Sequence, residues 1–147
     1  MAIVDTYVTG SFVEDRNPNQ FIGIRLPFYK SDGPEGYFAS TSTTIDAVKE
    51  NIKNLIQTEK GERYLQPDLG VSLRRHLFEN LEEDVSDSIR SDIMSAFALW
   101  LPFVKIVRID VNVQSGEDEY SRNSLKIKII FSVDQIPNSL ESVQVEL

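Results

Sequence analysis

Apolar side chains recur every three or four residues in one segment near the middle of the chain, which is the spacing of a helix face. These apolar positions are Ile45, Val48, Ile52, Leu55 and Ile56. Thr43 or Thr44 can cap the first turn by accepting from its free amides, and Gly61 can end the helix. The pattern therefore predicts a first helix over residues 44–59. The charged residues expected to face water are Asp46, Lys49, Glu50 and Lys53.

A second apolar stripe continues for about four turns further along the chain. It consists of Val85, Ile89, Ile93, Ala96, Phe97 and Trp100. Asn80, with Glu83 three residues later, matches a capping box at the start of this helix. Pro102 is expected to end it, because the residue before a proline avoids the helical region.

The segment between these helices, residues 58–79, reads "TEKGERYLQPDLGVSLRRHLFE". Pro67 in "QPDLG" predicts a turn, after which Asp68 can cap a short helix. Leu69, Leu73 and Leu77 would share its apolar face, and Arg74, Arg75 and Glu79 would point outward.

After Pro102 the apolar period changes from three or four residues to two, which is typical of strands. The alternating apolar positions are Val107, Ile109, Val111 and Val113, then Leu125, Ile127, Ile129, Phe131 and Val133, and finally Val143, Val145 and Leu147. The polar "SGEDEYSRNS" reads as a hairpin loop between the first two strands. The predicted fold class is α+β: a small antiparallel sheet, the C-terminal meander, with two main helices packed on one face.

The N-terminal part has weaker signals. Residues 1–20 include "EDRNPNQ", a composition of turns, and are interpreted as a flexible N-terminal arm. Residues 21–28 alternate and contain Pro27, so they predict an edge strand that "YFAST" could pair with in a hairpin. At 147 residues in all, we expect residues 21–147 to form a single domain.

Composition excludes several classes of protein. The chain has 15 Lys and Arg against 23 Asp and Glu, a formal charge of −8, which would repel the phosphates of nucleic acid. It has no cysteine, so disulfide frameworks and thiolate metal sites are excluded. The start lacks the pattern of an export signal, and the longest apolar run, residues 96–104, is too short to cross a bilayer. We therefore expect neither nucleic acid nor a membrane as a partner.

Candidate chemistry is sparse. His76 is the only histidine, so a multi-histidine metal site is impossible, and we interpret it as a surface or half-buried structural residue. No glycine pattern matches a phosphate-binding loop. Glu62, Asp68 and Glu79 could in principle supply the two carboxylates of a glycosidase, but few aromatic residues remain outside the predicted core to line a sugar-binding groove. Three interpretations of residues 58–79 stay open: a turn with surface ion pairs, an interface, or a catalytic loop.

The stretch "TEKGERYLQPDLGVSLRRHLFENL" resembles the signature of the baseplate wedge family of contractile-tailed phages, the family of gene product twenty-five, also labelled lysozyme-like. "IIFSVDQIPNSLESVQVEL" is similar to that family's closing pair of strands, and the resemblance covers about residues 40–147. It implies a non-enzymatic subunit without cofactors, located in the virion tail baseplate and in the host cytoplasm during assembly. It also implies a fold similar to the C-terminal domain of the tail sheath protein.

The resemblance further implies two partners. The helical core bundle of other baseplate wedge proteins would contact Glu62, Arg63, Trp100, Leu101 and Phe103, and the tail sheath protein would add a strand beside Val143, Val145 and Leu147. Glu62 and Arg63 would also form ion pairs that fix their loop, whose backbone geometry would come from Gly61, Pro67 and Gly70.

One departure from the family pattern shapes these expectations. Where the family carries glutamate-proline-arginine, this chain reads Trp100, Leu101, Pro102 and Phe103, and only the proline is kept. We therefore expect Trp100, Leu101 and Phe103 to be buried against a partner helix or against the chain's own sheet. The alternatives are a peptidoglycan-cleaving hydrolase, or an equivalent adaptor in another contractile injection system such as type VI secretion.

Overall fold

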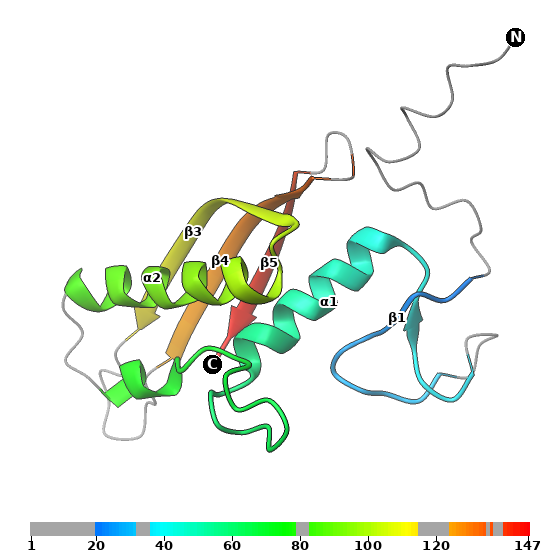
Figure 1. Ribbon diagram of the computed structural model, residues 1–147, viewed down its shortest axis with the longest axis horizontal. Coiled ribbons are helices and arrows are strands. Elements are labelled where there is room, and N and C mark those ends of the chain that lie inside the picture. The colour runs from blue at the N-terminus through cyan, green and yellow to red at the C-terminus, as the bar shows by residue number, and fades with distance from the viewer. Residues whose placement is uncertain (1–19, 32–35, 79–82, 115–123, 135, 137–139) are drawn as a thin grey trace, which may run out of the picture.

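Two helices lie on one face of a three-stranded sheet, and a small hairpin lies on the other side of the first helix (Figure 1). The computed structural model describes residues 20–31, 36–78, 83–114, 124–134, 136 and 140–147. Its elements are β1 (Gly23–Ile24), β2 (Ser40–Thr41), α1 (Thr44–Gln57), the 3-10 helix η1 (Arg74–Phe78), α2 (Glu83–Trp100), β3 (Val104–Gln114), β4 (Ser124–Val133) and β5 (Glu141–Glu146). The predicted α+β class is confirmed.

The start of α1 is fixed by a threonine cap. The Thr43 hydroxyl accepts a hydrogen bond from the Asp46 N–H (3.2 Å) and donates one to the Asp46 carboxylate (2.7 Å). At the other end, the Thr58 N–H and hydroxyl both donate to the Asn54 carbonyl, at 3.1 and 2.6 Å. The helix therefore ends at Gln57, two residues before the predicted end, because Thr58 adopts an extended conformation.

The sheet has the order β3-β4-β5, and all its pairs are antiparallel. Helix α1 packs against β5 and α2 against β3, so together they cover one face (Figure 1). The central strand β4 buries every second side chain, and these are the predicted residues Leu125, Ile127, Ile129, Phe131 and Val133. The predicted meander and its two covering helices are confirmed.

The first strand of the meander departs from the predicted phase. Ile106 pairs with Phe131 but Arg108 pairs with Ile130, so Val107 is an extra residue, a β-bulge. Because a one-residue slip reverses the side-chain alternation, Val107 is exposed, whereas Val104 and Ile109 on either side of the bulge are buried. The prediction that Val107 shares a face with Ile109 was wrong.

The short helix also differs from its prediction. Asp68 does not start a helix there: the Leu69 N–H donates to Gln66, and helical structure begins only at Arg74. Glu59 caps η1, because its carboxylate accepts from the Arg74 N–H at 3.1 Å. The start of η1 is therefore fixed by Glu59, which lies 15 residues earlier in the chain.

Strands β1 and β2 form the predicted N-terminal hairpin in a shorter form, joined by a further bridge between Lys30 and Phe38. Glu50 holds this hairpin against α1, because its carboxylate accepts from the Leu26 N–H (3.0 Å) and from Lys53 Nζ (2.9 Å). Glu50 is therefore buried, and the prediction that it faces water was wrong.

Some predictions fall on residues outside the described ranges. These are the capping role of Asn80, the outward position of Glu79, the loop at residues 115–123 and the arm up to residue 19. Within the described ranges, no helix has both the length and the apolar character needed to cross a bilayer.

Candidate partner-binding surfaces

Residues 58–73 form a closed loop between α1 and η1. The Val71 N–H donates to the Thr58 carbonyl (2.9 Å), and the Gly61 N–H donates to the Pro67 carbonyl (2.7 Å). Gly61 and Gly70 have positive φ angles of 88° and 116°. A Cβ on Gly70 would lie 2.1 Å from the Thr58 carbonyl oxygen, so the two ends of the loop can cross this closely only at a glycine.

Two charged residues of this loop hold it by hydrogen bonds, not by the expected ion pairs. The Glu62 carboxylate accepts from the Glu59 N–H (3.0 Å), and Arg63 donates to the Asn54 side-chain carbonyl (3.0 Å). Across the residues that the structure describes, neither side chain is close enough to an opposite charge to form an ion pair. The prediction of ion pairs here was wrong, because both partners are uncharged groups.

The tip of the closed loop exposes two large apolar side chains. Tyr64 is 97% exposed and Leu65 is 89% exposed. Because five backbone hydrogen bonds across residues 58–71 fix the loop, this tip projects from a rigid base. Neither residue was predicted from the sequence to bind a partner. The available signal was an adjacent aromatic and leucine between a charged turn and a proline, outside any helix or strand pattern.

Two shallow grooves run along the exposed side of α1. The first has a volume of about 370 Å³ and lies between the hairpin and the loop, with Ile24, Phe28 and Arg63 in its walls. The second has a volume of about 160 Å³ and leads to Trp100. Asn51 and Asn54 line both grooves, so the two form one continuous surface from the hairpin to the end of α2.

The three apolar residues at the α2–β3 junction lie at different depths. Leu101 is buried in the chain's own core, Trp100 is half-buried against it, and Phe103 is 36% exposed. The carbonyl of Phe103 accepts from the Asp134 N–H (3.1 Å), which fixes the backbone at this corner. A partner could therefore reach Trp100 and Phe103, whereas Leu101 already packs against its own sheet.

Strand β5 is an edge strand of the described sheet. Leu125 and Leu147 exchange both backbone hydrogen bonds, at 3.1 and 3.0 Å. Since such pairs alternate along an antiparallel ladder, Val143 and Val145 also bond to β4. The N–H and C=O groups of Ser142, Gln144 and Glu146 then point away from β4. The valine side chains are buried, so the free edge consists of backbone groups and not of apolar side chains.

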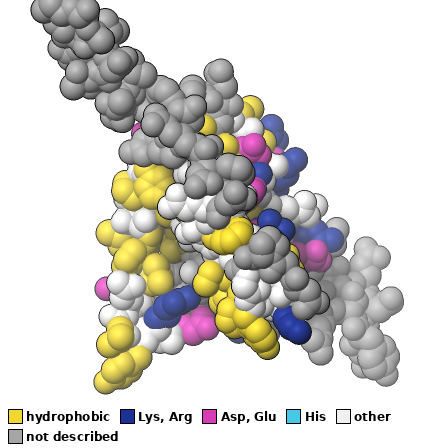
Figure 2. Space-filling view, turned by 90° about the vertical axis from the view of Figure 1, so that its right-hand side faces the viewer, with side chains coloured by type: hydrophobic (Ala, Val, Ile, Leu, Met, Phe, Trp, Pro, Cys, Tyr) yellow, Lys and Arg dark blue, Asp and Glu magenta, His cyan; other side chains and the backbone are white. Residues whose placement is uncertain are grey.

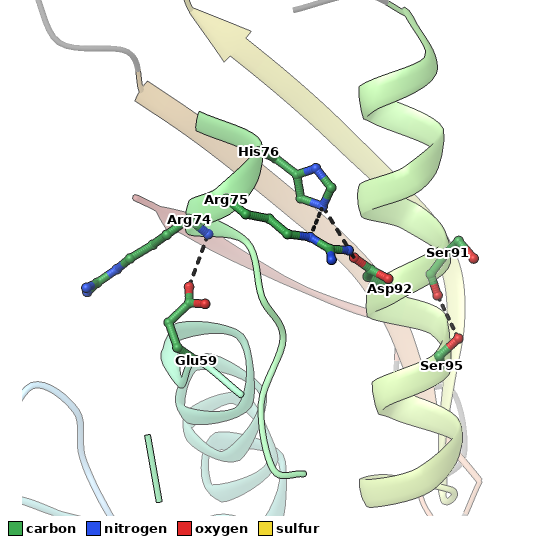
Figure 3. A network of polar contacts seen from close by, with 7 residues as sticks. All are labelled: Glu59, Arg74, Arg75, His76, Ser91, Asp92 and Ser95. Atoms are coloured by element: carbon green, nitrogen blue, oxygen red, sulfur yellow. Dashed lines mark hydrogen bonds and ion pairs between the residues drawn. The ribbon is translucent and has the colours of Figure 1, made fainter. Parts of the chain in front are cut away.

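His76 is buried, with only 3% of its surface exposed, and the expectation of a surface or half-buried position was wrong. Its Nε2 lies 3.3 Å from Asp92 Oδ2 and 3.3 Å from Arg75 Nε, and Arg75 also binds the same carboxylate oxygen at 2.6 Å (Figure 3). Because Asp92 lies on α2, this cluster joins η1 to α2. Asp92 and Arg75 occupy the Nε2 position, so the arrangement holds two elements together and does not present a free base.

The described residues offer little for metal or acid–base chemistry. Among them, no group of three or more His, Asp or Glu side chains lies close enough to hold a metal ion. Among the described residues that line these two grooves, the one carboxylate is that of Glu50 in the first groove, and the Leu26 N–H and Lys53 already bind it. The surface features that remain are an apolar loop tip, a continuous groove and a free strand edge, all of which suit protein partners.

Known proteins are similar to this chain in sequence and in fold. A family model described as baseplate wedge protein gp25 matches residues 42–138. The baseplate wedge protein gp25 of Enterobacteria phage T4 is 32% identical over 108 residues, which are 74% of this chain and 78% of the T4 protein.

Solved structures of lower identity share the fold. A chain from the anti-feeding prophage baseplate is 20% identical with a TM-score of 0.60, over 78% of this chain and 86% of that chain. A candidate tail lysozyme from Geobacter sulfurreducens is 21% identical with a TM-score of 0.58, over 73% of this chain and 92% of that chain.

Proposed function

The chain belongs to the baseplate wedge protein gp25 family, and from this premise we propose that it joins the wedge of a contractile tail to the first ring of the tail sheath. It is a baseplate wedge protein of contractile tail systems. The finer role has two parts: one surface binds the helical core bundle of other wedge proteins, and the free edge of β5 accepts a strand from a sheath subunit. Assembly would take place in the host cytoplasm, before the virion or injection device is complete.

The wedge-facing surface would consist of Arg63, Trp100 and Phe103, as the family resemblance implies, together with the loop tip. Tyr64 and Leu65 support this assignment because a large exposed aromatic on a rigid loop loses little conformational entropy on binding. Glu62 would act by holding the loop through the Glu59 N–H. Leu101 would act from within the core by fixing the α2–β3 junction, since its side chain is buried.

The unpaired edge of β5 is the observation that carries the sheath-binding role. An edge strand with outward N–H and C=O groups can extend a sheet by adding one strand from another chain. Glu141 and Glu146 are occupied by Lys49 (3.0 Å) and Lys126 (3.4 Å), so their charges are partly neutralised beside this edge. The strand would be held in place by the side chains of Val143, Val145 and Leu147, which pack in or against the core. Its outward-pointing backbone groups would remain available to the sheath strand.

Binding to the sheath can be tested by proline substitution at the outward positions of β5. Gln144→Pro removes an N–H that points away from β4, and its side chain is exposed, so the fold should survive. We expect this variant to lose the neighbouring sheath protein in a co-purification and to retain the wedge proteins. Gln144→Ala, which keeps the N–H, is the matched control and should retain both.

Val143→Pro is a less specific variant, because the Val143 N–H belongs to the ladder with β4 and the side chain is buried. Loss of sheath in that variant could reflect unfolding. If Gln144→Pro is folded by circular dichroism and still binds the sheath protein as wild type does, strand addition at β5 is not the mechanism.

The wedge-facing surface has its own test. Tyr64→Ser with Leu65→Ser should weaken co-purification with wedge proteins and leave sheath binding intact. A matched control is Met94→Ser with Val107→Ser, which removes two exposed apolar side chains, one on α2 and one on β3, that are not part of the proposed surface. Equal losses in both double variants would show that the loop tip has no special part in wedge binding.

Cell-wall hydrolysis is the second candidate function, because one solved structure with this fold is a candidate tail lysozyme. Glycosidases use two carboxyl groups about 5–10 Å apart across a cleft. The first groove beside α1 contains Glu50, which is already bound to Lys53 and to the Leu26 N–H, and among the described residues the lining of the second contains no carboxylate. We therefore expect no clearing in a turbidity assay on bacterial cell walls. Clearing by wild type that is abolished in Glu62→Gln would overturn the structural role.

A further inference from the structure

The three-stranded sheet has two outer strands, and their edges differ. Strands β3 and β5 lie on opposite sides of β4, and α2 packs against β3 (Figure 1). The pairs between β5 and β4 are in continuous register, whereas the register between β3 and β4 shifts at Val107. The β5 edge is therefore regular, and the β3 edge is interrupted.

The bulge at Val107 changes the β3 edge in two ways. A bulge bends and twists its strand, so the backbone groups on either side of it no longer line up for a straight incoming strand. Positive charges also flank it, because the side chains of Lys105 and Arg108 are 70% and 69% exposed. Their ion pairs with Asp134 and Asp110 hold them in place, at 2.7 and 2.6 Å. Bulges and charged side chains both protect edge strands from pairing with another chain.

A side chain of α2 covers the β3 edge just after the bulge. The odd-numbered residues of β4 bond to β5, so its even-numbered residues bond to Arg108 and Asp110 of β3. The N–H and C=O of Ile109, which lies between these two, therefore point to the outside. Arg90 Nε donates to this carbonyl at 3.4 Å, and Arg90 Nη1 is held by the Asp87 carboxylate at 2.7 Å. An incoming strand would have to displace Arg90 before it could use the Ile109 carbonyl.

The β5 edge has no such cover in the part of the chain that the structure describes. Its outward backbone groups belong to Ser142, Gln144 and Glu146, and no side chain among the described residues bonds to them. The ion pairs of Glu141 and Glu146 use their carboxylates and leave the backbone of β5 unoccupied. The sheet therefore has one open edge and one covered edge.

We infer that the sheet accepts an added strand at the β5 edge alone, and that Arg90 and the bulge at Val107 close the β3 edge to a second copy of this chain. With both edges open, the β5 edge of one copy could pair with the β3 edge of the next. Such a head-to-tail contact does not close on itself and builds filaments. It would also occupy the edge that we propose for the sheath strand, and this consequence alone rests on the proposed function.

The hairpin is the other surface through which copies of the chain could associate. On the side of the molecule that carries the hairpin, hydrophobic side chains form patches between charged groups (Figure 2). Phe28 and Tyr37 of the hairpin are 66% and 67% exposed. Because exposed apolar patches favour association, an experiment on the sheet edges has to separate the two surfaces.

Opening the β3 edge tests the inference in the full-length protein. The combined variant carries Arg90→Ala, which frees the Ile109 carbonyl, and a deletion of Val107, which makes the register with β4 continuous. In sedimentation equilibrium we expect wild type to be a monomer, and the weight-average mass of the combined variant to rise about twofold or more with protein concentration. Lys60→Ala is the matched control, since it also removes one positive charge but lies in the closed loop.

Further substitutions identify the edge that takes part. Adding Gln144→Pro removes an outward N–H of β5, so it should return the combined variant to a monomer. Adding Phe28→Ser with Tyr37→Ser instead should leave the association unchanged. Circular dichroism establishes that each variant is folded. If the combined variant does not fold, Arg90→Ala alone decides, with a smaller rise in mass expected because the bulge remains.

Three results would overturn the inference. The first is a folded edge variant that stays monomeric at every concentration, and the second is a wild type that already forms oligomers sensitive to Gln144→Pro. The third is association that survives Gln144→Pro or is lost with the hairpin substitutions, which would place the contact elsewhere. If the masses change as expected but wild type binds no sheath protein, the proposed function fails and the closed β3 edge stands.

Discussion

The N-terminal hairpin and the C-terminal sheet both contain aromatic and β-branched residues, which are mostly exposed in the hairpin and mostly buried in the sheet. Phe131 in β4 is fully buried beneath the two helices, whereas Phe28 in the hairpin is two-thirds exposed. The sheet has α1 and α2 on its apolar face, whereas the described part of the hairpin packs beside α1 and is held to it by the Glu50 carboxylate. Aromatic and β-branched residues therefore stabilise the fold in one region and remain largely exposed in the other.

Truncating one phenylalanine in each region should show the largest difference in the free energy of unfolding. Phe131→Ala should lower the free energy of unfolding by about 3–5 kcal/mol, because it leaves a cavity in the core. Phe28→Ala should lower it by less than about 0.5 kcal/mol, since the side chain is mostly in water already. Urea denaturation of both variants measures the difference. Equal losses would mean that the hairpin belongs to the same cooperative core.

Gly61 and Gly70 in the closed loop both have positive φ angles, but they differ in the space around them. Gly70→Ala should lower the free energy of unfolding by about 3 kcal/mol, because the new Cβ would meet the Thr58 carbonyl and the φ angle is unfavourable. Gly61→Ala also places alanine at an unfavourable positive φ angle, but the new Cβ would meet no neighbouring atom. We therefore expect it to lower the free energy of unfolding by about 1 kcal/mol. Thermal unfolding should show the lower midpoint for Gly70→Ala, and the reverse order would contradict the close crossing of the loop ends.

The Glu50 clamp should affect the hairpin more than the sheet. Glu50→Ala leaves the Leu26 N–H without its acceptor, at a cost of about 1–2 kcal/mol to local opening. Hydrogen exchange of the hairpin amides should then become about tenfold faster, with little change in β4. Glu50→Gln, which keeps an acceptor oxygen, should recover part of the protection. Uniform acceleration across both regions would instead show that Glu50 supports the whole fold.

The smallest effect is expected at the ion pair between α1 and β5. Lys49 and Glu141 lie 3.0 Å apart and are partly exposed, so the pair should contribute less than about 1 kcal/mol. A double-mutant cycle with Lys49→Ala and Glu141→Ala measures this coupling, which should shrink further at high salt. A coupling above about 2 kcal/mol would place this pair in a much drier environment than its exposure indicates.

Local patterns predicted the helices and the central strand well. The three-and-four spacing before Gln57 and the alternation from Leu125 to Val133 both match the structure, because each element buries one face with its own regular period. The phase of β3 could not be predicted, since the bulge at Val107 arises from pairing with β4 and has no marker in the local sequence.

The candidate binding surfaces were predicted less completely. The loop glycines and the edge strand could be anticipated from turn chemistry and order along the chain. Tyr64 and Leu65 were missed, because no local pattern shows whether an apolar pair in a loop packs inward or projects outward. Glu50 and His76 were placed in the wrong environment for a related reason: their partners, the Leu26 N–H and Asp92, are distant in sequence.

The sequence by itself determined the period of each element, the turns at Gly61 and Gly70 and the family to which the chain belongs, because all of these depend on neighbours along the chain. Tertiary structure decided which strand edge stays unpaired, which charges are buried and which apolar residues remain exposed. The physical reason is that burial depends on what packs from across the fold: the helices cover Phe131 and leave Phe28 in water.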